Sequence, residues 1–329
     1  MRPVALLLAA VLAVGAPSPA FAYLKLGVRV GGQVVDLRWT APVPYFVTER
    51  GVPGVSAEQL RDVVVRAFST WQAVPTAAVQ SQFMGFTSAP PGLLDQRTVL
   101  GFLDRPDLDR VLGATSFLLD ARTGEIREAD IFFNTRFNWS VASGGESGRV
   151  DLESVAVHEI GHLFGLGHSA VGETEMVAGG GRRVIASGAV MFPIAMTSGA
   201  TADRRLQPDD RAGISDLYPG SSFRGETGSI SGRITKSGSG VFGAHVIATN
   251  LRTGELIGGF ALNTQGEYVI AGLPPGSYVV RVEPLDDADT ESFFSSPVDI
   301  DFRVAYSPRL VTVPAGGGAS GVDVEVRSK

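Results

Sequence analysis

The stretch Val157–Ser169 reads VHEIGHLFGLGHS and holds three of the four histidines of this 329-residue chain, His158, His162 and His168. Residues at i and i+4 of a helix lie on one face about one turn apart. His158 and His162 are therefore expected to point at the same place, with Glu159 beside them. The other segments of the chain are therefore considered by how they position or cover this cluster.

The spacing of these residues favours a catalytic zinc site. Such a site takes three ligands from the protein and leaves the fourth position to water. Gly165 can adopt the left-handed conformation that ends a helix, which would bring His168 back to the metal. Zinc lowers the pKa of bound water and polarises a carbonyl, and Glu159 is placed to act as general base. A closed structural site would need a fourth protein ligand, and the chain has no cysteine to supply one.

The extended pattern H-E-x-x-H-x-x-G-x-x-H is far more specific than its first five residues alone. With it, the chain resembles the metzincin clan and, within that clan, the matrixins. Four stretches carry the resemblance: Val157–Ser169, ending in the serine typical of matrixins; Val190–Pro193, similar to the Met-turn, with Met191 beneath the zinc and Pro193 closing the turn; Leu206–Tyr218, similar to the closing helix; and the helix that ends at Phe68–Trp71.

The resemblance implies an α+β catalytic domain, with a twisted, mixed five-stranded sheet and three helices, that binds one catalytic zinc ion. It implies an endopeptidase whose protein or peptide substrate lies antiparallel to an edge strand, for which Leu112–Leu119 is the candidate. It also implies a hydrophobic S1′ pocket between His158 and the segment after Met191. A zinc amidase acting on cell-wall peptides is an alternative, because its zinc chemistry would be alike.

Several features depart from the family pattern. No histidine precedes His158, so the second, structural zinc of animal matrixins is expected to be absent. Without a cysteine there is no cysteine switch for latency. Asp36 is a candidate to occupy the open metal position, but an ordinary strand residue is favoured. The connection Gly172–Gly188 is longer than in the family and is expected to be a surface loop.

Several other polar residues are candidates for sites. Calcium is common in matrixins, but the candidate ligands match no defined calcium loop, so solvated carboxylates are favoured for Asp104, Asp107, Asp109, Asp120 and Asp130. Asp209 and Asp210 are expected to stabilise a helix start, and one of them to anchor that helix to the domain. His245 is expected to be a surface or half-buried residue of a strand.

The N-terminus has the pattern of a signal peptide. A basic Met1-Arg2 precedes the apolar run Val4–Val14 and the small-x-small site Ala20–Ala22. The run is shorter than the roughly 20 residues of a membrane span. We therefore expect residues 1–22 to be removed and the chain to be secreted, either extracellular or periplasmic, with no integral membrane segment. The net charge of -6 gives no reason to expect nucleic acid as a partner.

The chain is expected to fold as two domains joined by a linker. Residues 23–219 form the catalytic domain, 220–227 the polar linker, and 228–329 a second domain. Seven or so short period-two runs in the second domain predict a β-sandwich. Runs such as Gly266–Tyr278 make it similar to the carboxypeptidase regulatory-like, transthyretin-like sandwich.

The second domain carries no catalytic constellation, and its role is open among a spacer, a folding aid and a docking surface. The alternative to a protease is accordingly a surface-binding or adhesive protein in which the sandwich is the functional part, docking to an extracellular surface or matrix. We expect a monomer in either case.

Overall fold

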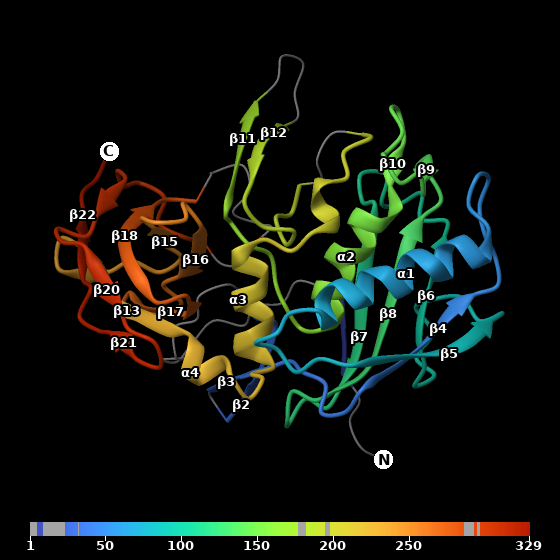
Figure 1. Ribbon diagram of the computed structural model, residues 1–329, viewed down its shortest axis with the longest axis horizontal. Helices are drawn as coiled ribbons and strands as arrows, with labels where there is room; N and C mark the ends of the chain where they lie inside the picture. Colours follow the sequence, from blue (N-terminus) through green and yellow to red (C-terminus); the bar gives the residue numbers. More distant parts are fainter. Residues whose placement is uncertain are drawn as a thin grey trace.

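The computed structural model describes residues 5–8, 24–31, 33–176, 182–194, 198–285, 293–294 and 297–329. Figure 1 shows two halves: a mixed sheet covered by helices, and a β-sandwich, with helix α3 standing between them. This arrangement confirms the expected α+β domain followed by an all-β domain. Most of the predicted signal peptide, and the predicted new N-terminus Tyr23, lie outside the described residues.

The large sheet has six strands in the order β1-β7-β8-β6-β4-β5. Their bounds are β1 Ala5–Leu8, β4 Val43–Thr48, β5 Ser81–Thr87, β6 Thr98–Leu103, β7 Gly113–Leu119 and β8 Ile126–Asn134. β4, β5, β6 and β8 run parallel, while β7 is antiparallel to β8 and β1 is antiparallel to β7. Apart from β1, which belongs to the predicted signal peptide, this is the expected mixed sheet of five strands.

Three helices build the catalytic half, each started by the local signal that its sequence contains. α1 (Ala57–Gln72) begins with a capping box, in which Ser56 and Gln59 satisfy each other's backbone N–H groups. α2 (Leu152–Leu163) is capped by Asp151, whose carboxylate accepts the N–H of Ser154 at 2.9 Å. α3 (Pro208–Leu217) has proline in its first turn.

The sequence prediction was wrong for the connection between residues 172 and 188. It is a two-stranded antiparallel hairpin of β11 (Gly172–Met176) and β12 (Arg182–Ser187), not a simple loop. The hairpin projects from the molecule in Figure 1. Its glycines 179–181 lie outside the described residues. Two short pairs complete this half: β2 (Gly27–Val30) with β3 (Gln33–Asp36), and β9 (Trp139–Ser140) with β10 (Val150–Asp151). The 3-10 turn η1 covers Ala202–Arg204.

The second half is a sandwich of two five-stranded sheets. One has β13 (Gly228–Lys236) at its centre, paired with β14 (Ser239–Gly240), β17 (Glu267–Leu273), β21 (Gly318–Ala319) and β22 (Val324–Val326). In the other, β15 (His245–Asn250) lies between β16 (Leu256–Phe260) and β18 (Gly276–Glu283), and β18 also pairs with β19 (Ala305–Tyr306) and β20 (Val311–Val313). The single-turn helix α4 (Phe223–Glu226) lies in the predicted linker.

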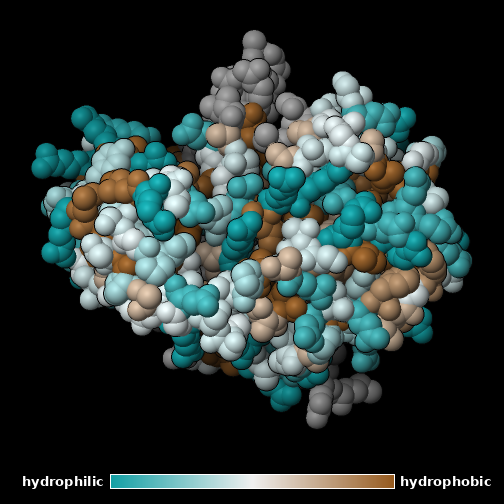
Figure 2. Space-filling model, in the orientation of Figure 1, coloured by the Kyte–Doolittle hydropathy of each residue, from teal (hydrophilic) through white to brown (hydrophobic). Residues whose placement is uncertain are grey.

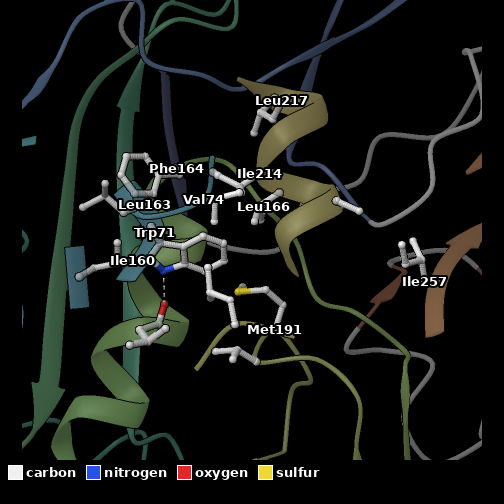
Figure 3. Packing of buried hydrophobic residues seen from close by; sticks show 14 of the residues in the cluster. Trp71, Val74, Ile160, Leu163, Phe164, Leu166, Met191, Ile214, Leu217 and Ile257 are labelled. Atoms are coloured by element: carbon white, nitrogen blue, oxygen red, sulfur yellow. Dashed lines mark hydrogen bonds between the residues drawn. The ribbon is translucent and has the colours of Figure 1, made fainter. Parts of the chain in front are cut away.

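One hydrophobic core runs through both halves. In Figure 3, Trp71 of α1, Phe164 and Met191 meet beside α3, and Ile257 of β16 lies on the far side of that helix. The indole N–H of Trp71 donates to the carbonyl of Val157 at 2.8 Å, which ties α1 to α2. On the face shown in Figure 2, apolar side chains form small patches among hydrophilic ones. Among the described residues, no helix combines the length and apolar character needed to cross a membrane.

Candidate metal centre

Helix α2 and the turn after it bring the three predicted ligands together. His158 and His162 lie on one face of α2, and the helix ends at Leu163. Gly165 has φ of +99°, so it takes the left-handed conformation expected of it. A Cβ at this position would lie 2.2 Å from the carbonyl oxygen of Leu37. The turn is therefore restricted to glycine by both its conformation and its surroundings, and it returns the chain to His168.

The Nε2 atoms of the three histidines converge. Nε2 of His162 lies 3.1 Å from that of His158 and 3.2 Å from that of His168. The other ring nitrogen faces a backbone carbonyl in two cases: Nδ1 of His158 lies 2.8 Å from the oxygen of Val190, and Nδ1 of His162 lies 2.8 Å from that of Leu166. Because a carbonyl only accepts, each Nδ1 carries the hydrogen, and Nε2 keeps a free lone pair.

These donors fit a zinc ion. Zinc–nitrogen bonds of about 2.0–2.1 Å in tetrahedral geometry separate two ligand nitrogens by about 3.3 Å, close to the spacing seen here. Unprotonated lone pairs that face one another at this distance repel unless a cation lies between them. Burial lowers the pKa of His158 to about 4, and burial also lowers that of His162 well below its usual value. Both rings are thus in the neutral form that metal binding requires.

Glu159 is buried beside this cluster and points towards strand β7. Its Oε2 accepts a hydrogen bond from the hydroxyl of Thr115 at 2.7 Å, and the same hydroxyl lies 3.0 Å from the main-chain oxygen of Glu159. Burial raises the pKa of Glu159 to about 7, while the Thr115 bond opposes that rise. A carboxyl group with such a pKa can accept and return a proton near neutral pH. The sequence offered no signal that would have identified Thr115 as its partner.

The turn that contains Met191 packs against α2, the helix that carries His158 and His162. Met191 is buried, and its Sδ lies so close to α2 that a Cβ on Gly161 would stand 2.3 Å from it. Asp210 holds the turn, since its carboxylate accepts the N–H groups of Val190 at 2.8 Å and Met191 at 3.0 Å. This confirms that one acidic residue anchors the closing helix. Pro193 follows in the same turn and is half-buried.

Asp209 has a contact that the sequence did not reveal. Its Oδ2 accepts the hydroxyl of Ser169 at 2.6 Å, and its Oδ1 accepts the backbone N–H of Gly258 at 2.7 Å. Ser169 directly follows His168, whereas Gly258 belongs to the sandwich. Burial, followed by the charge of Asp210, raises the pKa of Asp209 to about 7. The helix-start reading of Asp209 was therefore incomplete.

The other candidate residues lie apart from the histidines. Asp36 pairs with Lys25 at 3.4 Å and is not part of the cluster. Of the calcium candidates, Asp104 and Asp107 bind arginine side chains, and Asp130 is buried with backbone N–H groups as its donors. Within the part of the chain that the structure describes, the three histidines are the sole group of three or more His, Cys, Asp or Glu side chains that lie close enough to share a metal ion.

The prediction for His245 was wrong. The residue is 2% exposed, with Nδ1 3.1 Å from Glu283 and its ring stacked on that of Phe260 at 5.2 Å. A Cβ on Gly258 would lie 2.8 Å from its Nε2. His245 is thus buried where the sandwich meets the catalytic half. Its contacts with Glu283, Phe260 and Gly258 come from neighbouring strands of the sandwich, which a period-two pattern within one strand does not reveal.

Comparison with known proteins agrees with this geometry. Residues 38–179 match the matrixin family, and residues 229–327 match the carboxypeptidase regulatory-like domain. Metalloendoproteinase 5-MMP of Arabidopsis thaliana is 31% identical over 195 residues, which are 56% of this chain and 46% of that protein. Metalloendoproteinase 2-MMP of the same plant is 32% identical over 182 residues, covering 52% of this chain and 40% of the relative. Mouse matrix metalloproteinase-25 is 37% identical over 89 residues, or 27% of this chain and 12% of that protein. The chain thus spans less than half the length of these relatives.

Proposed function

We propose that this chain, which carries a matrixin domain followed by a carboxypeptidase regulatory-like domain, is a zinc-dependent endopeptidase that cleaves protein or peptide substrates. The observation that carries the proposal is the convergence of the Nε2 atoms of three histidines, with a buried carboxyl group of raised pKa beside them. His158, His162 and His168 are the proposed metal ligands. Gly165, Met191 and Pro193 are proposed to support them.

The chain's own residues divide the work of hydrolysis. A zinc ion bound here would supply Lewis acidity, which acidifies the attacking water and stabilises negative charge on the carbonyl oxygen. Glu159 accepts a proton from the water while the oxygen of the water bonds to the carbonyl carbon. It then delivers that proton to the departing amide nitrogen as the C–N bond breaks. The hydroxyl of Thr115 holds the carboxylate of Glu159 in place for both transfers.

Strand β7 is the proposed platform for the substrate backbone. It pairs with β8 on one side, and on its other side with β1, in antiparallel register from Ala5↔Leu119 to Leu8↔Ser116. If residues 1–22 are removed as a signal peptide, this outer edge becomes free to take an extended peptide by strand addition. Thr115 on the same strand would then place the peptide beside Glu159, and the S1′ pocket would lie between His158 and the segment after Met191.

The remaining assignments belong to the same proposal. We propose that residues 23–219 are the catalytic unit of a monomer that is exported to the extracellular space or periplasm, with residues 220–227 as connection. One zinc ion per chain is the proposed cofactor. The resemblance to two plant metalloendoproteinases and a mouse matrix metalloproteinase supports the reaction class. The cleavage specificity is best mapped with a peptide library.

The decisive variant is Glu159→Gln, which preserves the size of the side chain and removes its basicity. We expect it to retain one zinc ion per chain and to lose cleavage of an unfolded protein by at least about 100-fold, the lower range for a general base. Zinc content by atomic absorption and cleavage by gel assay are measured on the same sample. Wild-type cleavage by this variant would sink the assignment of Glu159.

A further inference from the structure

The sandwich and the catalytic half meet along strand β16. Among the described strands, β16 pairs with β15 alone, so its second edge faces helix α3. The N–H groups of a strand edge need acceptors or cover. Here the N–H of Gly258 donates to Oδ1 of Asp209, the second residue of α3, at 2.7 Å. A carboxylate of the catalytic half therefore accepts a hydrogen bond from the edge of the sandwich.

The other oxygen of that carboxylate serves the loop of the metal site. Oδ2 of Asp209 accepts the hydroxyl hydrogen of Ser169 at 2.6 Å. Oγ of Ser169 in turn accepts the N–H of Val171 at 3.1 Å, and the N–H of Ser169 donates to the carbonyl of Met191 at 2.8 Å. Both side chains are buried. One carboxylate thus joins the backbone of the sandwich to the residue that follows His168.

A second contact reaches His168 from the sandwich side. The ring of Phe293 meets that of His168 edge to face, with centroids 6.3 Å apart, and Phe293 packs on Phe260 of β16 at 5.8 Å. Leu24 and Ala170 of the catalytic half belong to the same buried apolar cluster as these two phenylalanines. The third histidine is therefore supported by the sandwich through two contacts of different chemistry, both of which begin at β16.

We propose that the sandwich is a built-in support of the metal centre: β16 fixes Asp209, which acts through Ser169 as a positioning residue for His168. This rests on the proposed function, since it takes His168 as a metal ligand. Groups that orient metal ligands typically contribute 10–100-fold to metal affinity or activity. Asp209 contacts Ser169 and not the ligand itself, so we expect its contribution to metal affinity to be about tenfold, the lower end of that range.

Gly258→Ala tests the support from the sandwich side. The added Cβ would lie 2.8 Å from Nε2 of His245 within the sandwich and 2.6 Å from Cγ2 of Val171, and the contact with Val171 pushes β16 away from the catalytic half. No metal ligand is altered. We expect the full-length zinc-loaded chain to pass its zinc to a chromogenic chelator about tenfold faster than wild type. The matched control is Gly276→Ala, another strand glycine of the sandwich, whose added Cβ has its nearest contact at 3.3 Å; its zinc release should be that of wild type.

Two further variants keep the test sharp. Adding Val171→Ala to Gly258→Ala removes Cγ2 of Val171, the nearer clashing atom. The rate of zinc release should then fall most of the way back to the slow wild-type rate. Asp209→Asn leaves β16 unaltered and removes one of the two acceptor oxygens, so it serves if Gly258→Ala does not fold. It should also speed zinc release and change the visible spectrum of the cobalt-substituted protein. Combined with Gly258→Ala, it should add little, because both act on one chain of contacts.

The outcomes separate this proposal from the proposed function. Wild-type zinc release in both Gly258→Ala and Asp209→Asn overturns the support role, even if either variant melts at a lower temperature, and leaves the endopeptidase intact. A wild-type chain that binds no zinc would instead remove the proposed function, and this proposal with it.

Discussion

Gly161 lies on α2 between two predicted ligands, and its replacement by alanine sets two effects against each other. Alanine in a helix interior is favoured over glycine by about 1 kcal/mol. The added Cβ, however, would stand 2.3 Å from Sδ of Met191 and 2.7 Å from Cζ2 of Trp71. Overpacking of a core typically costs about 1–3 kcal/mol. The sign of the result depends on whether these neighbours can move.

The two neighbours differ in freedom. The thioether of Met191 can rotate away, but the ring of Trp71 is fully buried and its N–H is bonded to Val157. The contact with that ring must therefore open by moving α1 from α2. We expect overpacking near the upper end of its range, and a net loss of about 1–2 kcal/mol after the gain in helix propensity. For a domain of about 200 residues, that lowers the melting temperature by about 2–8 °C.

Thermal and urea unfolding followed by circular dichroism measure this loss. The matched control is Gly225→Ala in helix α4, where an added Cβ meets no atom within 4 Å. Gly161→Ala should cost less in a Met191→Val background than in wild type, because valine has no δ atom to meet the new methyl group. A Gly161→Ala protein as stable as wild type, or more stable, would refute the packing argument.

Three other perturbations have defined outcomes. Gly165→Ala should lower the free energy of unfolding by at least about 2 kcal/mol, because alanine is strained at φ of +99° and its Cβ clashes with the carbonyl oxygen of Leu37. Urea unfolding measures this loss, and a loss under about 0.5 kcal/mol would contradict the turn geometry. Thr115→Val should shift the acidic limb of the kcat/KM pH profile to higher pH, because the hydrogen bond from Thr115 lowers the pKa of Glu159. A limb at the wild-type pH would show that Thr115 does not tune Glu159. Burial raises the pKa of Asp130 from 3.8 to about 7, so the folded state holds its proton where the unfolded state has lost it. The stability that this proton contributes is therefore lost as the pH rises from about 4 to 7, by up to about 1.4 kcal/mol per unit, and Asp130→Asn should lack that slope in unfolding titrations.

The helices and the metal cluster were readable from the sequence because their signals are local. The capping box at Ser56, the spacing of His158 and His162, and the glycine at 165 each act within a few residues. A close approach also occurs at Gly161 of α2, where Met191 and Trp71 are the neighbours. Short-range patterns of this kind depend little on the rest of the fold.

What escaped the sequence depends on contacts between distant segments. The sequence of β5 shows no period-two pattern, because Met84 and Phe86 occupy its exposed face and its apolar residues do not alternate with polar ones. Strand β16 is equally hard to predict, because Gly258-Gly259 lowers its strand propensity. The glycine at 258 is explained by Val171 and His245, which leave no room for a Cβ. The second task of Asp209 was hidden for the same reason, since its partner lies 49 residues away.

The central claim is that the histidine cluster binds the zinc ion on which peptide-bond cleavage depends. The most direct measurement is a zinc titration of the purified full-length chain, stripped with a chelator and assayed for cleavage of an unfolded protein after each addition. We expect no cleavage without metal and full recovery at one equivalent of zinc per chain. Cleavage that persists in the stripped protein, or a loss of cleavage that zinc cannot reverse although the chain binds it, would show that cleavage does not depend on this zinc ion.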